Sequence, residues 1–312
     1  MAGSILDDLP RQGEPDLSDF EWLDLRRAVV QAPEPLDFVL PGFKSGTVGA
    51  LVSPGATGKT MLALQAAVTV AGGPDMLELA SMDAAWRRTG GRVVFLTGED
   101  PADILNARFH AIGQRLNPVE RETIFQNLFV APLVGRGANI MTADWRCWIS
   151  RVSRDARLIV IDTLRRFHHL DENDGGHMAR LLAYMEQLCR ENSTSVLFLH
   201  HTSKNGALNG GDAQQASRGS SVLTDNARFQ ANLIGMTQDQ TKQFDIDENC
   251  RRNFVRLSFP KINYSAPIPD QWFRRGTGGL LEPVLLEPAL KRTAFKGVKA
   301  ASFKKGDDDE QW

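Results

Sequence analysis

Residues 53–60, SPGATGKT, lie between a short apolar run and a stretch rich in alanine and leucine. The apolar run, 47–52, is typical of a buried strand, and the stretch from Lys59 to Ala71 is typical of a helix. Apart from Ser53 at the first glycine position, the segment matches GxxxxGK[ST], in which glycines let backbone N–H groups converge on phosphate oxygens. The following helix directs the positive end of its dipole at the same point. This order of elements predicts a nucleotide-binding α/β core.

The same segment predicts the roles of individual residues. Lys59 is expected to reach the β- and γ-phosphates of ATP, and Thr60 is expected to hold Mg²⁺. ATP and Mg²⁺ are therefore the expected cofactors. The candidate nucleotide-binding residues are Ser53, Pro54, Gly55, Ala56, Thr57, Gly58, Lys59, Thr60 and Met61.

Three further apolar runs predict the rest of the sheet. They lie at 92–97, 158–161 and 195–200, and stretches of helical periodicity separate them. Continuous apolar runs joined by helices indicate a mostly parallel central sheet that helices flank on both faces. After Asp225 hydrophobic and polar residues alternate instead, as in FVRLSF at 254–259, which favours antiparallel strands. The predicted fold class is α/β, with antiparallel strands toward the C-terminus.

Polar side chains follow these apolar runs: Glu99 and Asp100, then Asp162, then His200 and His201. Ligands of open parallel sheets bind outside the carboxyl ends of the strands. Asp162 suits the acid that holds Mg²⁺, directly or through water, and Glu99 suits the base that orients water for attack on the γ-phosphate. Because successive strand side chains point to opposite faces, only one histidine can face the nucleotide. We expect His201 to sense the γ-phosphate and keep His200 as the alternative.

Each of these residues also has an ordinary structural interpretation. An acidic residue after a strand is common in any loop, and Asp100 is also suited to capping the helix that begins near Pro101. A histidine at a strand end is more often structural than catalytic. The hypothesis therefore depends on all of these side chains meeting at one edge of the sheet.

Composition excludes several classes of protein. The 312 residues include 42% hydrophobic residues and carry a net charge of −2, which suits a globular chain rather than a disordered one. The three cysteines are widely spaced, which argues against a disulfide framework or a zinc ribbon. No apolar run approaches the roughly 18 residues of a membrane span, and the N-terminus lacks a signal-peptide pattern. We expect a cytoplasmic protein with no membrane partner.

The charge is unevenly distributed, which suggests three segments. Residues 1–40 hold nine acids and three bases, whereas residues 251–305 hold twelve bases and three acids. We expect an acidic N-terminal arm over 1–34 that includes a helix for subunit contact. We further expect one ATPase domain over 35–288 and a disordered tail over 289–312.

Two segments are candidates for contact with single-stranded DNA, which needs a basic track for phosphates. The first is 203–219, which contains Lys204 and Arg218 and is too rich in glycine and polar residues to pack. The second is the basic region 251–275, which contains Lys261. The alternative for the first segment is an ordinary surface loop.

Several longer motifs are more specific than the phosphate loop. The runs GTVGALVSPGATGKTMLALQ, GEDP, IDTLRRFH, FLHHTSK, QQASRGSSVL and NYSAPIPDQWFRR occur in this order. Together they resemble the RepA replicative helicases of broad-host-range, IncQ-type plasmids, which are RecA-like ATPases. The resemblance covers roughly residues 35 to 285.

The resemblance implies an ATP-driven hexameric ring that moves 5′ to 3′ along single-stranded DNA and unwinds forked DNA. Primase and initiator proteins would then be partners supplied by other chains. It assigns Lys59, Thr60, Glu99, Asp162 and His201 the roles given above. It further implies that Arg228 is an arginine finger for the neighbouring subunit and that Arg108 is a second arginine near the phosphates.

Two other functions remain open at this point. One is a recombinase-like or regulatory ATPase that assembles on DNA without unwinding it. The other is an ATP-switched loader or adaptor that hydrolyses slowly. The presence of the water-orienting Glu99 together with Lys59, Asp162 and Arg228 argues against an inactive switch.

Overall fold

The computed structural model describes residues 22–83, 86, 89–201 and 221–289. The chain divides into two compact units, Met1–Asp37 and Phe38–Trp312. In the first unit, helix α1 (Leu25–Val30) begins after Asp24, whose side chain accepts a hydrogen bond from the Arg27 N–H at 3.1 Å. All of its residues are exposed. Most of the expected acidic arm and nearly all of the expected tail lie outside the described residues.

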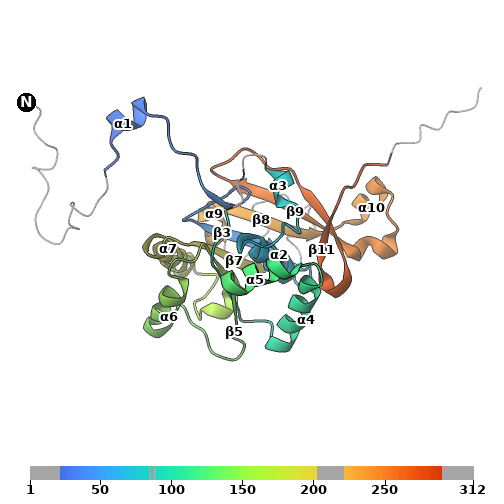
Figure 1. The fold of residues 1–312 in the computed structure, drawn as a ribbon, viewed down its shortest axis with the longest axis horizontal. Helices are drawn as coiled ribbons and strands as arrows, with labels where there is room; N and C mark the ends of the chain where they lie inside the picture. Colours follow the sequence, from blue (N-terminus) through green and yellow to red (C-terminus); the bar gives the residue numbers. More distant parts are fainter. Residues whose placement is uncertain (1–21, 84–85, 87–88, 202–220, 290–312) are drawn as a thin grey trace, which may run out of the picture. The chain divides into compact units, whose positions relative to one another are not determined.

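The second unit is built on a nine-stranded sheet with the order β11-β10-β9-β8-β3-β7-β6-β4-β5 (Figure 1). Strands β8, β3, β7, β6, β4 and β5 run parallel, and β9, β10 and β11 are antiparallel. The predicted fold class is confirmed. The strands are β3 (Val48–Ser53), β4 (Val93–Thr97), β5 (Leu128–Pro132), β6 (Leu158–Asp162), β7 (Ser195–His201), β8 (Phe229–Gly235), β9 (Phe254–Ile262), β10 (Gln271–Arg275) and β11 (Leu281–Val284), and β1 (Phe38–Leu40) pairs with β2 (Phe43–Lys44) apart from them.

Helices pack on both faces of the sheet because its central strands are apolar on both. Leu51 and Phe95 pack on the face covered by α2, whereas their neighbours Val52 and Leu96 pack on the face covered by α7. The helices are α2 (Lys59–Val70), α3 (Leu79–Met82), α4 (Ala102–Gly113), α5 (Pro118–Asn127), α6 (Ala143–Ser153), α7 (Gly175–Asn192), α9 (Ser221–Asn226) and α10 (Gln238–Phe244), with short 3₁₀ segments η3 (Leu164–Phe167), η5 (Glu248–Asn253) and η6 (Thr277–Gly279). Within the described residues, no helix is long and apolar enough to cross a membrane.

One part of the sequence-based prediction is wrong. The alternating pattern after Asp225 favours antiparallel edge strands, but β8, the first strand of that segment, pairs parallel with β3, with Gly49 level with Phe229. The first five residues of β8 are buried, so it is part of the sheet's interior rather than its edge. The antiparallel part begins one strand later, at β9.

The parallel register brings the ends of four strands together. Ser53 at the end of β3 is level with His201 at the end of β7, and Thr97 at the end of β4 is level with Asp162 at the end of β6. Residues that follow these strands therefore emerge at the same edge of the sheet. That edge carries the phosphate loop.

A core substitution tests this packing. Phe95 is fully buried at the centre of β4, whereas Phe125 on α5 is 71% exposed. Phe95→Ala should lower the free energy of unfolding by about 3–5 kcal/mol, because it leaves a cavity in the sheet. Phe125→Ala, the matched control, should change it by less than about 1 kcal/mol. Urea denaturation measures both; equal losses would contradict the described core.

Candidate functional site

The phosphate loop closes on itself through short polar contacts. The hydroxyls of Ser53 and Thr57 both donate to the Pro54 carbonyl, at 2.9 and 2.8 Å. Ala56 and Gly58 adopt the left-handed region, with φ of 61° and 100°. Gly58 immediately precedes α2, so the first N–H groups of that helix face the loop. Such a loop before a helix N-terminus suits an anion.

Lys59 and Asp162 form a buried pair beneath this loop. Lys59 Nζ lies 3.7 Å from Asp162 Oδ1, and their side chains are 4% and 0% exposed. Burial lowers the pKa of Lys59, while the nearby Asp162 and Glu99 carboxylates oppose the shift. Burial raises the pKa of Asp162, opposed by Lys59 and the Thr60 hydroxyl. Burial therefore disfavours the charged form of each side chain, and each is partly stabilised by the charge of the other.

The donor set fits Mg²⁺. Both carboxylate oxygens of Asp162 are buried, and no donor of the described residues makes a well-aligned hydrogen bond with them, although the Thr60 hydroxyl and the Lys59 ammonium lie near enough to stabilise the charge. Oxygen donors are what Mg²⁺ prefers, and it is usually held by one or two protein groups together with phosphates and water. Asp162 and the Thr60 hydroxyl would hold it, and the bound ion would neutralise phosphate charge.

Glu99 is fixed by two side chains from neighbouring strand ends. Its Oε1 atom accepts a hydrogen bond from the Thr163 hydroxyl at 2.9 Å and lies 3.2 Å from His201 Nε2. The hydrogen bond with His201 is the main cause that lowers the pKa of Glu99 to about 2. Glu99 therefore stays ionised at neutral pH. An oriented carboxylate of this kind can hold a water molecule for in-line attack.

The two histidines at the end of β7 lie in different environments. His201 is half exposed and contacts Glu99, whereas His200 is 7% exposed. Burial lowers the pKa of His200 to about 4, opposed by Glu172. His201 is therefore the histidine on the side of Glu99, and His200 is held neutral on the other side.

Arg108 on α4 lies near this edge and is paired. Its Nη2 atom lies 2.9 Å from Asp100 Oδ2. The Asp100 N–H points to the Thr97 hydroxyl at 3.4 Å, so the turn after β4 is held from both sides. Arg108 is thus connected to the loop that carries Glu99.

Arg228 lies at the opposite edge of the sheet. It is exposed and directly precedes Phe229, the first residue of β8, which is level with Gly49 near the start of β3. Gly49 is four residues before Ser53, which is about 13 Å along the strand at about 3.3 Å per residue. Arg228 therefore lies at the end of the strands away from the phosphate loop of its own chain.

Of the three candidate DNA-binding residues, only Lys261 is described. Its Nζ atom donates to the carbonyls of Thr224 and Asp225, close to Arg228. Burial is the main cause that lowers the pKa of Lys261, and the Arg228 charge lowers it further. Lys204 and Arg218 lie outside the described residues.

Sequence reasoning missed two residues at this site. Thr163 donates to Glu99, and its position directly after Asp162 was a usable signal. Arg275 donates to the carbonyls of Ala56 and Thr57 in the phosphate loop. No local pattern distinguishes Arg275 from the other bases of 251–275.

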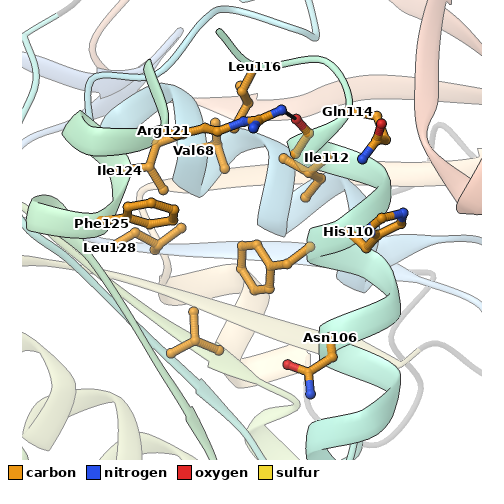
Figure 2. A pocket seen from close by; sticks show the side chains of 13 residues that line it. Val68, Asn106, His110, Ile112, Gln114, Leu116, Arg121, Ile124, Phe125 and Leu128 are labelled. Carbon is orange, nitrogen blue, oxygen red and sulfur yellow. Dashed lines mark hydrogen bonds between the residues drawn. The ribbon is translucent and has the colours of Figure 1, made fainter. Parts of the chain in front are cut away.

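A separate apolar groove of about 500 Å³ lies between α4 and α5 (Figure 2). Phe125 and Leu128 border it on one side and His110 and Asn106 on the other, and Arg121 donates to the Gly113 carbonyl at 2.8 Å. None of the candidate site residues that the structure describes lines it.

Comparisons with solved structures support the fold. The ATPase domain of G40p matches with a TM-score of 0.51 and 14% identity over 80% of this chain and 88% of that one. A DnaB-like replicative helicase, solved to show its interactions with primase, matches with a TM-score of 0.50 and 14% identity over 76% of this chain. The match spans 57% of that helicase.

The family comparison covers more than half of the sequence. A family model described as an AAA domain matches residues 14–207, which include the phosphate loop and the ends of β4, β6 and β7. The chain therefore belongs to this AAA domain family.

Proposed function

We propose that this protein is an ATP-driven replicative DNA helicase. In this account it assembles into a ring, most simply a hexamer, moves 5′ to 3′ on single-stranded DNA and unwinds forked duplex in the replication of a plasmid or related replicon. Primase and initiator proteins supplied by other chains would act with it. The motifs shared with RepA-type helicases and the fold shared with a DnaB-like helicase support this assignment.

One observation carries the enzymatic part of the proposal. Glu99 is held as a carboxylate by Thr163 and His201 at the same edge as Lys59 and Asp162. Lys59 would bind the β- and γ-phosphates, and Asp162 with Thr60 would hold Mg²⁺. Glu99 would orient the attacking water and accept its proton. His201 would contact the γ-phosphate before hydrolysis and lose that contact when the phosphate leaves. The remaining residues of the loop would provide backbone N–H donors.

A second observation supports the assembly. Arg228 lies at the opposite edge from the phosphate loop, so within the described part of one chain it would not reach the γ-phosphate of its own site. A head-to-tail ring would bring the Arg228 edge of one subunit against the phosphate edge of the next. Hydrolysis would then depend on the position of the neighbour.

The sequence after His201 supports coupling to DNA. The segment 203–219, with Lys204 and Arg218, follows β7 directly, so its first residue is separated from the γ-phosphate sensor by one residue. Binding of single-stranded DNA by this segment would thus communicate with the state of the nucleotide. Lys261 lies near Arg228 and would contact DNA or the neighbouring subunit.

Glu99→Gln tests the catalytic role. The amide keeps the size of the side chain and loses the base, so the hydrolysis rate should fall by about 10²–10⁴-fold while ATP affinity stays within about threefold. Steady-state ATPase assays and binding of a fluorescent ATP analogue measure the two quantities. As a control, Glu122→Gln alters an exposed carboxylate on α5 and should leave both unchanged. Wild-type turnover in Glu99→Gln would exclude this role.

Mixed assemblies test whether Arg228 acts across the interface. Arg228→Ala alone should bind ATP but lose about 10³–10⁵-fold in rate, because the cation at the γ-phosphate is missing. When Arg228→Ala and Glu99→Gln chains are co-assembled, about a quarter of the interfaces in a randomly mixed ring combine an intact Glu99 with an intact Arg228. ATPase activity should reappear in that proportion. A mixture as inactive as either variant alone would show that Arg228 does not act across an interface.

Strand displacement tests the helicase assignment against the two alternatives. With ATP and Mg²⁺, the protein should displace a labelled strand from a forked duplex that carries a 5′ single-stranded tail. Lys59→Ala should abolish displacement, and removal of Mg²⁺ by EDTA should do the same. DNA-stimulated hydrolysis without displacement would favour the recombinase-like ATPase, and slow hydrolysis that DNA does not stimulate would favour the loader or adaptor.

A further inference from the structure

Arg275, the last residue of β10, packs on the phosphate loop from behind. Its Nη2 atom donates to the Ala56 carbonyl at 3.1 Å and also to the Thr57 carbonyl, and its Nε atom donates to the Arg252 carbonyl at 3.2 Å. A Cβ atom at Gly58 would lie 3.1 Å from Arg275 Nη1. The guanidinium group therefore covers the loop directly before α2 begins.

These bonds bear on the direction of the loop's N–H groups. In a trans peptide the carbonyl and the N–H of the next residue point in opposite directions. Bonds from Arg275 to the carbonyls of Ala56 and Thr57 therefore turn the N–H groups of Thr57 and Gly58 to the other side of the loop. That is the side from which a phosphate loop binds its ligand.

No carboxylate in the part of the chain that the structure describes balances the charge of Arg275. Within the described residues, no ion pair joins Arg275 to an acid, whereas its neighbour Arg274 lies 3.7 Å from Glu282 Oε2. Burial lowers the pKa of Arg275 below its ordinary value, although an arginine stays protonated at neutral pH. A half-buried positive charge held by backbone carbonyls raises the potential at the phosphate loop.

The hairpin that carries Arg275 is anchored independently. Buried Gln65 on α2 accepts from the Leu281 N–H at 2.8 Å and donates to the Leu281 carbonyl at 3.0 Å. Leu281 pairs with Arg275 in the β10–β11 ladder. Removing the guanidinium group alone should therefore leave the hairpin attached to α2.

We propose that Arg275 is a positioning residue for the triphosphate: it fixes the phosphate loop in its binding form and adds a positive charge behind it. The inference rests on the proposed ATP binding of the same site. It also ties the antiparallel end of the sheet to the nucleotide, because the Arg275 side chain joins β10 to the loop.

Equilibrium binding of ATP tests the proposal. Arg275→Gln removes the charge and most of the donors, and the Kd for ATP should rise about tenfold. Arg275→Lys keeps the charge but loses the planar fork of donors, so it should recover part of the affinity. Arg274→Gln changes the adjacent residue, whose side chain is 61% exposed, and should bind like the wild type. The maximal hydrolysis rate of Arg275→Gln at saturating ATP should stay within about threefold of the wild-type rate, because Glu99 is untouched.

The outcomes separate the inference from the function on which it rests. Failure of the wild type to bind ATP would overturn the proposed function. Binding by the wild type with an unchanged Kd in Arg275→Gln would overturn the role of Arg275 alone. An equal loss of ATP affinity in Arg274→Gln would also overturn it. So would a fall in the maximal hydrolysis rate of Arg275→Gln without a change in its Kd for ATP. The melting transition without nucleotide shows whether Arg275→Gln folds. If it does not, Arg275→Lys replaces it: a higher Kd for ATP in Arg275→Lys than in Arg274→Gln supports the role of Arg275, and equal Kd values overturn it.

Discussion

The parallel register of β3, β7, β6 and β4 is the constraint on which the rest of the site depends. It makes β3 end level with β7 and β4 end level with β6, with the two pairs offset by about two residues, so that the phosphate loop, the acid after β4, the acid at the end of β6 and the histidine at the end of β7 share one edge. The side chains come from positions up to 148 residues apart, between Ser53 and His201. Burial of the strands on both faces fixes that register, because a slip would misalign the apolar side chains with both layers of helices.

Electrostatics at this edge favour a ligand with negative charge and a divalent cation. Lys59 and Asp162 are both buried, and neither is fully satisfied by the other at 3.7 Å. Glu99 is by contrast well satisfied, because Thr163 and His201 stabilise its charged form. The arrangement therefore separates two roles among the acids. Asp162 has the surroundings of a cation ligand, and Glu99 is oriented and ionised by its two neighbours.

Much of this arrangement could be predicted from the sequence, because the relevant signals are local. The strand-loop-helix around Lys59 and the polar residues after apolar runs identify Glu99, Asp162 and His201 without any knowledge of the fold. The orientation of β8 could not be predicted, since its connection rather than its residues makes it parallel to β3. Arg275 was also hidden, because its contact with Thr57 spans 218 residues and arises from a hairpin that the local pattern does not place.

The two edges of the sheet carry complementary halves of one reaction centre in this account. A single chain has the phosphate loop and Glu99 at one edge and Arg228 at the other, so hydrolysis should require a second chain. The most direct test is the ATPase rate per subunit measured against protein concentration, with the mass of the assembly followed by light scattering. The account predicts a rate per subunit that rises with concentration and levels off as the oligomer forms. A constant rate per subunit in dilute, monomeric protein would contradict it.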